Sequence, residues 1–331
     1  MSVRPLIAIT MGDPAGIGPE LIHFALSDPS IYEICKPFVV GDAKILENVK
    51  QVTKSKLKIN IIKNPSDGIF KDGTIDLINI EGSDIVSPGK PTKSSGKAMI
   101  DYIKYSIDLT KKGLSSAIVT CPINKAAMQL AQSEFHGHTE LLASRTNTDR
   151  FAMMLTGKSL RVVLVTIHIP LTRVTEVLTT EKIIETIDIT NKSLIERFGI
   201  ENPKIAVAGL NPHAGEDGLF GDEEERIIAP AVDAVQKNGI DATGPYPPDT
   251  VYFNASKGDF DAVIAMYHDQ GLIPFKMIHF SDGVNTTLGL PIIRTSVDHG
   301  TAYDITGKGI ADHRSLKEAI FMASIQANNS K

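Results

Sequence analysis

In RVVLVTIH (residues 161–168), KIAVAGLNPH (204–213) and DAVIAMYH (261–268), an apolar run is followed closely by a histidine. Short apolar runs of this kind predict strands that are buried on both faces of a parallel sheet. Because the strands of such a sheet point the same way, the residues that follow them gather along one edge, where open α/β folds bind their ligands. The sequence therefore predicts that His168, His213 and His268 gather at one edge of a sheet.

Three neutral imidazoles at one edge form a candidate site for a divalent metal ion. Imidazole suits zinc, iron, cobalt and nickel and is a poor ligand for magnesium. A single histidine after a strand is more often a loop or capping residue, but the threefold repetition favours a shared metal. The chain has only two cysteines, Cys35 and Cys121, which excludes a thiolate zinc ribbon and implies no disulfide framework.

Length and composition limit the class of protein. The 331 residues exceed what one core usually serves, so we expect two α/β lobes. A net charge of −5 with scattered basic residues argues against nucleic acid as a partner. The first apolar run is broken by Gly12 and Asp13, unlike a signal peptide, and no apolar stretch approaches the length of a membrane span. We therefore expect a cytoplasmic protein without a membrane partner.

Strand-like and helix-like segments alternate along the chain, which predicts βαβ units and a mostly parallel sheet. The expected strands are residues 6–11, 38–40, 74–80, 117–120, 151–155, 161–166, 204–208 and 262–266. The expected crossover helices include amphipathic stretches at 97–111, 180–198 and 222–237. Two loops rich in glycine and proline, 87–91 and 243–248, are candidates for passages between the lobes.

The loop GDPAGIGPE, which begins at Gly12, follows the first expected strand and leads into a helix. Its glycines permit a tight turn, and Pro19 suits the first helical position. The amides at such a helix start can hold an anion, and a purely structural turn explains the pattern equally well. A dinucleotide fingerprint would need glycine where Leu21 stands, and the phosphate-loop motif Gly-Lys-Ser/Thr is absent.

Basic and amide side chains form a second group of candidates beyond strand ends. Such side chains suit carboxylate or phosphate groups, arginine by bidentate pairing and lysine as a point charge. Together with the histidines they describe a pocket for a small anionic molecule bound to a metal. The group comprises Asn124 and Lys125 in CPINK, His138 and Thr139 in GHTE, and Lys276, Asn285 and Arg294.

Several ordered segments between about residues 6 and 310 resemble one family. They are GDPAGIGPE, PINK, GHTE, GLNPHAGE, AMYHDQGLIPFK, GVN and LGLPIIRTSVDHGTA, and they are similar to the 4-hydroxythreonine-4-phosphate dehydrogenase family, including its paralogs that act on D-threonate or D-erythronate 4-phosphate. The resemblance implies an isocitrate/isopropylmalate dehydrogenase-like fold with two α/β/α lobes around a central cleft. It also implies a homodimer with shared active sites. We expect a discontinuous first lobe, 1–130 plus 285–331, and a second lobe, 131–284, that carries the metal ligands and dimer contacts.

The resemblance also assigns roles to single residues. It implies that His168, His213 and His268 bind the metal and that a segment similar to the relatives' adenosine-side loop, residues 298–312, binds NAD or NADP. A cofactor site in this segment would explain why the chain lacks the glycine-rich dinucleotide-binding fingerprint. Cys121 stands where the family has glycine or alanine, and His136 has no counterpart. The implied substrate residues are His138, Thr139, Lys276, Asn285 and Arg294, the candidate catalytic bases are His138 and Asp249, and the cofactor residues are His299, Gly300, Thr301, Ala302, Asp304 and Asp312.

The implied reaction is an oxidative decarboxylation in pyridoxal phosphate biosynthesis. The 3-hydroxyl of 4-phosphooxy-L-threonine chelates a divalent metal, which lowers its pKa, and a hydride passes to NAD(P). The 3-oxo acid then loses carbon dioxide and gives 3-amino-2-oxopropyl phosphate. The histidine ligands favour zinc, with magnesium, cobalt or manganese as alternatives.

Other functions remain open from the sequence. GLFGDEE (218–224) and GPYPPDTV (244–251) resemble the paralogs that oxidise D-threonate or D-erythronate 4-phosphate to dihydroxyacetone phosphate. A third branch of the family oxidises cis-dihydrodiols of aromatic acids. A zinc metallohydrolase would use the same three histidines but would leave the 298–312 segment unexplained. A metal-dependent binding protein without catalysis is the simplest alternative.

Overall fold

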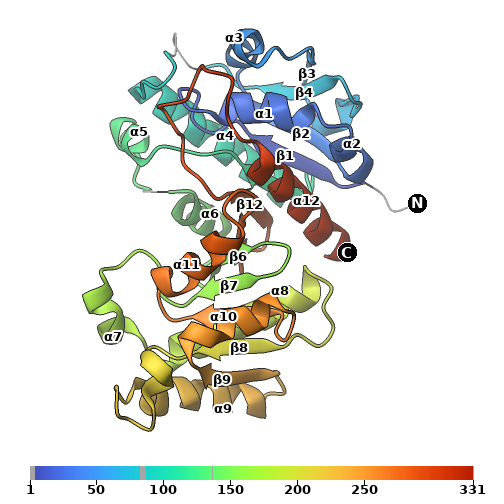
Figure 1. The fold of residues 1–331 in the computed structure, drawn as a ribbon. Coiled ribbons are helices and arrows are strands. Elements are labelled where there is room, and N and C mark those ends of the chain that lie inside the picture. The colour runs from blue at the N-terminus through green and yellow to red at the C-terminus, as the bar shows by residue number, and fades with distance from the viewer. Residues whose placement is uncertain (1–3, 83–86, 136, 331) are drawn as a thin grey trace. The chain divides into compact units, whose positions relative to one another are not determined.

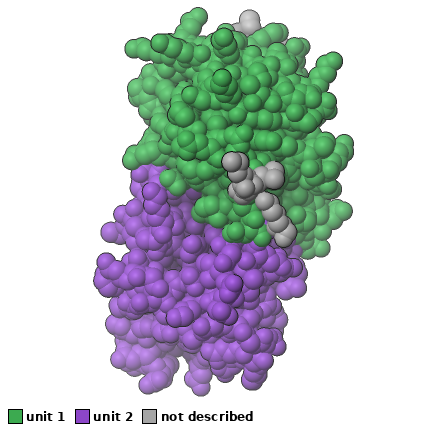
Figure 2. Space-filling view, turned by 90° about the vertical axis from the view of Figure 1, so that its right-hand side faces the viewer, with its two compact units in different colours: residues 1–149, 290–329, 331 green, residues 150–289, 330 purple. Residues whose placement is uncertain are grey.

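The computed structural model describes residues 4–82, 87–135 and 137–330. The chain folds as two compact units, shown in different colours in Figure 2: residues up to 149 together with 290–329, and residues 150–289. The boundaries predicted from the sequence were near residues 130 and 285. The two glycine- and proline-rich loops, 87–91 and 243–248, each lie inside one unit, so the prediction that they connect lobes was wrong.

In the first unit, the described strands form a parallel sheet. Their order is β3 (Lys58–Ile62), β4 (Thr74–Asn79), β2 (Lys36–Gly41), β1 (Leu6–Thr10), β5 (Ala117–Thr120) and β12 (Ile293–Val297). The helices of this unit are α1 (Gly18–Leu26), α2 (Ser30–Ile34), α3 (Ala43–Thr53), α4 (Lys93–Lys111), α5 (Lys125–Leu130), α6 (His138–Thr146) and α12 (Arg314–Asn329) (Figure 1). Helix α12 packs on β12 and β5, and α4 packs on β1, β2 and β5.

The second unit has a mixed sheet in which β6 runs antiparallel to both of its neighbours. The strand order is β11 (Val284–Leu288), β6 (Ala152–Thr156), β7 (Arg161–Leu164), β10 (Ala262–Ala265), β8 (Ile205–Ala208) and β9 (Ala242–Tyr246). Its helices are α7 (Val174–Val177), α8 (Thr180–Glu196), α9 (Ala229–Lys237), α10 (Pro248–Ser256) and α11 (His268–Ile278), and a π-helical turn, η4 (Glu224–Ile228), leads into α9.

The apolar runs of β7, β8 and β10 are explained by burial on both faces of this sheet. Val163, Val207 and Ile264 share one hydrophobic core with side chains of α8 and α9. Their strand neighbours, such as Val162 and Val263, point to the other face and join a core with α10 and α11. Both alternating positions of each strand must therefore be apolar. In the part of the chain that the structure describes, no helix is long and apolar enough to cross a membrane.

Strands β3, β9, β11 and β12 were not predicted from the sequence, and the last three have identifiable reasons. Strand β9 contains Gly244 and Pro245 and pairs with β8 alone in the described sheet, which is where a proline without an amide hydrogen is tolerated. Strands β11 (VNTTL) and β12 (IRTSV) bury polar side chains such as Thr286 and Thr295. Neither strand therefore contains the apolar run that served as the strand signal.

We expect Ile264→Ala to lower the free energy of unfolding by about 2–5 kcal/mol, because it removes a fully buried side chain from the core of β10 and leaves a cavity. Urea unfolding followed by circular dichroism measures the change. Ile61→Ala is the matched control: Ile61 lies on β3 with 60% of its surface exposed, so its effect should stay within about 0.5 kcal/mol. Equal losses in the two variants would contradict the burial argument.

Candidate active site

Three neighbouring parallel strands position the three predicted metal ligands. Strand β10 pairs in parallel with β7 on one side and with β8 on the other. The pairing continues past the strand ends, where the Thr166 hydroxyl donates to the Met266 carbonyl oxygen at 2.7 Å. The segments that carry His168, His213 and His268 therefore leave the sheet at the same edge.

His168 and His268 face each other beyond β7 and β10. Their ring centroids are 5.6 Å apart and the rings are tilted by 44°. Two imidazoles on one zinc ion, with Zn–N distances of about 2.0–2.1 Å, would place their centroids roughly 5 Å apart. Nδ1 of His268 is hydrogen-bonded to Oδ1 of Asp269 at 2.7 Å, a contact that orients a metal-binding imidazole and leaves its Nε2 for the metal. This pair fits a divalent metal.

His213 occupies the turn Pro212–Gly215 after β8. Its backbone is left-handed, with φ 53° and ψ 26°, and its ring lies 6.1 Å from that of Phe220, centroid to centroid. Within residues 4–82, 87–135 and 137–330, no group of three or more His, Cys, Asp or Glu side chains gathers in a way that could hold a metal. The described residues of one chain thus supply a pair of donors, and His213 as the third ligand stays a prediction.

A buried carboxylate, Glu224, holds the loop that carries His213. Only 5% of Glu224 is exposed, and its Oε1 accepts the backbone N–H groups of Leu210 and Asn211, each at 2.7 Å. Its Oε2 accepts the side-chain amide of Asn211 at 2.9 Å. Glu224 was not predicted from the sequence, because it stands in the acidic run DEEE and nothing in that run distinguishes it from its more exposed neighbours.

Gln270 connects the ends of β8 and β10. Its side-chain oxygen accepts the N–H of Met266 at 2.7 Å, and its side-chain amide donates to the carbonyl oxygen of Gly209 at 2.6 Å. The first turn of α11, which begins with His268, is thereby tied to the start of the His213 loop. The buried position of Gln270 follows from this role, and the sequence analysis also missed it.

In the first unit, a buried guanidinium lies near a neutral histidine. Arg294 of β12 is 3% exposed and donates to the Thr120 hydroxyl at 2.8 Å, and burial lowers the pKa of its guanidinium to about 9. His138 begins α6, and its buried Nε2 makes no hydrogen bond within the described part of the chain. Burial, and then the charge of Arg294, lower the pKa of His138 well below its ordinary value. His138 is therefore neutral at pH 7.

The remaining predicted substrate residues are divided between the two units. Thr139 follows His138 in the first turn of α6. In the second unit, the Lys276 ammonium of α11 lies 5.7 Å from the centre of the Phe280 ring, and Nδ2 of Asn285 lies 3.1 Å from the sulfur of Met153. Asp249 is exposed in the first turn of α10. Each unit thus contributes polar groups to the predicted set.

The predicted cofactor segment, residues 298–312, belongs to the first unit and packs against GDPAGIGPE. Thr301 is buried, and its carbonyl oxygen accepts the N–H of Ile17 at 3.1 Å. Ala302 is left-handed with φ 44°. A Cβ atom on Gly16 would lie 3.0 Å from the Thr301 side chain, so any side chain at this position would crowd the contact between the two segments. Four other predicted cofactor residues are exposed, namely His299, Gly300, Asp304 and Asp312.

The loop GDPAGIGPE is a close-packed turn. A Cβ atom on Gly12, which has φ +73°, would lie 2.4 Å from the carbonyl oxygen of Pro122. The amide of Ala15 donates to Oδ1 of Asp13, and the amide of Gly16 donates to the carbonyl oxygen of Asp13. These amides are bonded within the protein, so the structure favours the structural turn over an anion site at these positions.

The cysteines offer no reactive thiolate. Cys35 and Cys121 are both buried and free. Burial raises the pKa of the Cys35 thiol to about 12 and raises that of Cys121 as well. Both residues are therefore neutral packing groups at pH 7. His136, for which the sequence analysis found no role, lies outside the described residues.

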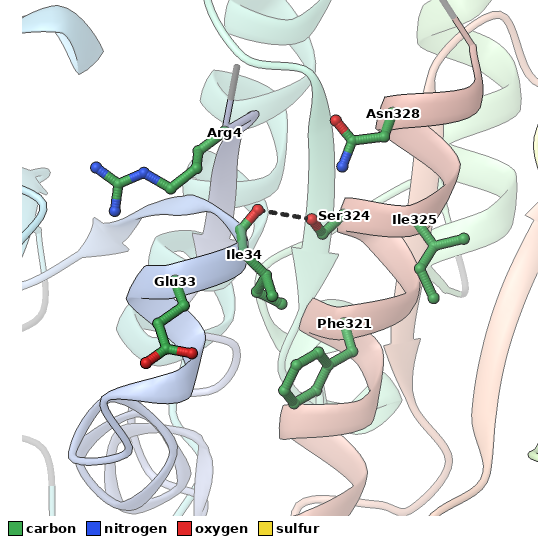
Figure 3. A pocket seen from close by; sticks show the side chains of 7 residues that line it. All are labelled: Arg4, Glu33, Ile34, Phe321, Ser324, Ile325 and Asn328. Carbon is green, nitrogen blue, oxygen red and sulfur yellow. Dashed lines mark hydrogen bonds between the residues drawn. The ribbon is translucent and has the colours of Figure 1, made fainter. Parts of the chain in front are cut away.

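A cavity of about 540 Å³ lies between α2 and α12 of the first unit (Figure 3). The Ser324 hydroxyl bridges these helices by donating to the carbonyl oxygen of Ile34 at 3.0 Å. None of the predicted site residues lines this cavity. Its walls are formed by Arg4, Glu33, Ile34, Phe321, Ser324, Ile325 and Asn328.

Comparisons with known proteins agree with one another. A model of the family described as "Pyridoxal phosphate biosynthetic protein PdxA" matches residues 33–323. The 4-hydroxythreonine-4-phosphate dehydrogenase of Desulforapulum autotrophicum is 57% identical, over 98% of this chain and 96% of its own. The D-threonate 4-phosphate dehydrogenase of Cupriavidus necator is 47% identical, over 96% and 95%. A crystal structure of 4-hydroxythreonine-4-phosphate dehydrogenase from Klebsiella pneumoniae matches with a TM-score of 0.91 and 42% identity, over 99% of both chains.

The fold and these similarities define an α/β enzyme of the dehydrogenase class. More particularly, the chain belongs to the family of the pyridoxal phosphate biosynthetic protein PdxA. This confirms the family resemblance and the oxidoreductase class that the sequence motifs predicted. The metallohydrolase and the non-catalytic binding protein lose their support, because the similar proteins are named dehydrogenases over nearly their full lengths.

We expect Glu224→Ala to destabilise the protein by about 2–3 kcal/mol, because the amides of Leu210 and Asn211 lose a buried acceptor. Hydrogen exchange at those amides should accelerate. Glu225→Ala is the matched control, because its neighbouring carboxylate is exposed. Unchanged exchange at the two amides in Glu224→Ala would show that Glu224 does not hold this loop.

Proposed function

We propose that the protein oxidises 4-phosphooxy-L-threonine (4-hydroxy-L-threonine 4-phosphate) at its 3-hydroxyl with NAD or NADP in the cytoplasm. The 3-oxo acid then loses carbon dioxide, so one substrate and NAD(P)+ give 3-amino-2-oxopropyl phosphate, carbon dioxide and NAD(P)H. Among the features of the site, the buried Arg294 beside the neutral His138 supports this proposal most directly. The names of the relatives at 57% and 56% identity agree with it.

Arg294 and Lys276 would bind the anionic groups of the substrate. Arg294 has a planar guanidinium that can pair with two oxygens of a carboxylate or phosphate, and Lys276 supplies a point charge. Thr139 and Asn285 would add neutral hydrogen bonds that orient the hydroxyl and amino groups. A doubly anionic acid suits this combination better than a neutral diol does.

His138 is the better candidate to accept the hydroxyl proton. Its depressed pKa keeps the imidazole neutral, and its Nε2 is buried without a hydrogen-bond partner among the described residues. A neutral imidazole near a bound hydroxyl can act as a general base. Asp249, the other candidate, is exposed at the start of α10, and it would need the substrate or a second chain to approach it.

His168 and His268 would hold the divalent ion, with His213 as the third ligand. Imidazole donors favour zinc over magnesium, with cobalt or manganese as further options. When bound, the ion would polarise the substrate oxygen and the nicotinamide ring would accept a hydride. Residues 298–312 would bind the adenosine side of the cofactor, by way of His299, Gly300, Thr301, Ala302, Asp304 and Asp312. The proposal includes an isocitrate dehydrogenase-like fold, with two lobes around a central cleft.

The same proposal includes a homodimer with shared active sites. Ile273 and Met277 of α11, together with Phe280 just beyond the end of the helix, form an exposed apolar strip, with Met277 83% and Phe280 80% exposed. Large exposed apolar side chains that cluster in this way mark contact surfaces. Lys276 lies on the same helix, so a second copy of the chain bound to this strip would lie next to the proposed substrate site. A dimer would also provide a second source for a metal ligand, because the described residues of one chain bring His168 and His268 together but contain no group of three possible metal ligands.

A second candidate is the oxidation of D-threonate or D-erythronate 4-phosphate, with decarboxylation to dihydroxyacetone phosphate. The observation in its favour is the 47% identity to the D-threonate 4-phosphate dehydrogenase of Cupriavidus necator. The amino acid and the hydroxy acid differ by an amine or a hydroxyl at one carbon, and the same guanidinium and imidazole would serve both. The higher identity of relatives named for the amino acid substrate supports our choice of that substrate as the first candidate.

The purified protein should reduce NAD+ or NADP+ when it is supplied with zinc, cobalt, manganese or magnesium and 4-phosphooxy-L-threonine. Absorbance of the reduced nicotinamide follows the reaction, and D-threonate and D-erythronate 4-phosphate complete the substrate panel. His213→Ala should lose bound metal and turnover together, whereas His313→Asn, outside the predicted ligands, should keep both. If no combination of metal, cofactor and substrate yields reduced cofactor, the dehydrogenase assignment is contradicted. Full activity in His213→Ala would show that His213 is not a metal ligand.

Replacing the buried guanidinium should weaken substrate binding more than folding. We expect Arg294→Lys to raise the KM of the phosphorylated acid by roughly 10-fold to 100-fold, because the ammonium cannot pair in the bidentate way. The KM of NAD(P) should change little. Arg145→Met, which removes a surface ion pair with Asp108, should leave both values within about twofold. An unchanged acid KM in Arg294→Lys would exclude Arg294 from the substrate site.

A further inference from the structure

The proposed cofactor segment, residues 298–312, has no helix or strand of its own and is held by an acceptor from elsewhere in the first unit. Glu20, in the first turn of α1, is 1% exposed. Its Oε1 accepts the N–H of Gly307 at 2.6 Å and its Oε2 accepts the N–H of Gly309 at 2.9 Å. Both oxygens of one buried carboxylate therefore bind this segment, which lies alongside α1 (Figure 1).

Two further contacts fix the earlier part of the same segment. The hydroxyl of Tyr303 donates to Oδ2 of Asp13, which is completely buried in the loop after β1. The N–H of Ile17 donates to the carbonyl oxygen of Thr301 at 3.1 Å. Together with the Glu20 contacts, these bonds reach from Thr301 to Gly309, a stretch that contains three of the six predicted cofactor residues, Thr301, Ala302 and Asp304.

Buried carboxylates are unfavourable unless charge-assisted hydrogen bonds compensate for the lost hydration. A glutamate in the first turn of a helix is already favoured by the helix dipole and could remain in water. Glu20 is instead directed at the two amides of an irregular segment. Such a contact orders the segment before a ligand arrives, and prior ordering increases affinity because less conformational entropy is lost on binding.

We infer that Glu20 is a positioning residue for the nicotinamide cofactor: its carboxylate holds the 298–312 segment in the binding conformation through the amides of Gly307 and Gly309, and the contact between Asp13 and Tyr303 is a second brace. The inference rests on the proposed function, in which this segment binds NAD or NADP. It assigns a role to two acidic residues of GDPAGIGPE without placing them in contact with the cofactor.

The test is Glu20→Gln in the full-length protein. Glutamine keeps one acceptor oxygen but turns an NH₂ group toward the other backbone N–H. We expect the KM of the cofactor and the Kd of NADH, measured by its fluorescence, to rise about tenfold, while kcat and the KM of the phosphorylated acid stay within about twofold. Glu33→Gln, an exposed position on α2 of the same unit, is the control and should change none of these values.

A second, milder variant tests the inference in case Glu20→Gln does not fold. Tyr303→Phe removes one hydroxyl, and a selective rise in the cofactor KM of about threefold is expected, with Tyr105→Phe, a partly exposed tyrosine of α4, as its control. The inference would be overturned, and the proposed function left standing, by either of two results. One is an equal change in kcat, in both KM values and in the Kd of NADH; the other is an unchanged Kd of NADH in both Glu20→Gln and Tyr303→Phe. A wild-type protein that neither reduces NAD(P)+ nor binds NADH would overturn the proposed function and the inference with it.

Discussion

Parallel hydrogen bonding among β7, β10 and β8 is the constraint on which the candidate site in the second unit depends. These strands are covered on one face by α8 and α9 and on the other by α10 and α11, so their side chains are apolar at every position except Arg161, with which β7 begins. Polar groups can appear only where the strands end. Because the strands run the same way, residues about 100 positions apart in the sequence, such as His168 and His268, come to lie with their rings 5.6 Å apart.

The loops beyond the strands have little regular structure, and single buried polar side chains hold them. Glu224 accepts the amides of the His213 loop, Gln270 connects the ends of β8 and β10, and Glu20 accepts the amides of Gly307 and Gly309. Each group is buried and hydrogen-bonded to the backbone, which compensates for its desolvation. Both units therefore stabilise their loops in the same way. A buried polar side chain binds backbone groups of the loop and fixes its conformation, as the hydrogen bonds of a helix or strand would.

The strands with continuous apolar runs could be predicted from the sequence, and β5 has the bounds that were expected of it. Strands β11 and β12 could not, because the buried positions between their aliphatic ends hold threonine, serine and Arg294 and so interrupt the apolar run. The common edge of the histidine segments followed from strand direction alone. In contrast, the burial of Glu224 beside the exposed Glu225 depends on the path of the chain after β8. The sequence also could not show that GDPAGIGPE packs against residues 301–309, because their contacts join positions about 290 residues apart.

In the proposed reaction, the pair Arg294 and His138 would couple substrate binding to proton transfer. Burial lowers the pKa of Arg294 to about 9, and burial together with the Arg294 charge lowers that of His138. An anion bound at Arg294 would offset that charge and raise both pKa values toward their ordinary range. The imidazole is thus already neutral before the substrate arrives, and it gains proton affinity once the anionic group is in place. By the same argument, a substrate that lacks the anionic group would lose its contact with Arg294 and would also meet a weaker base.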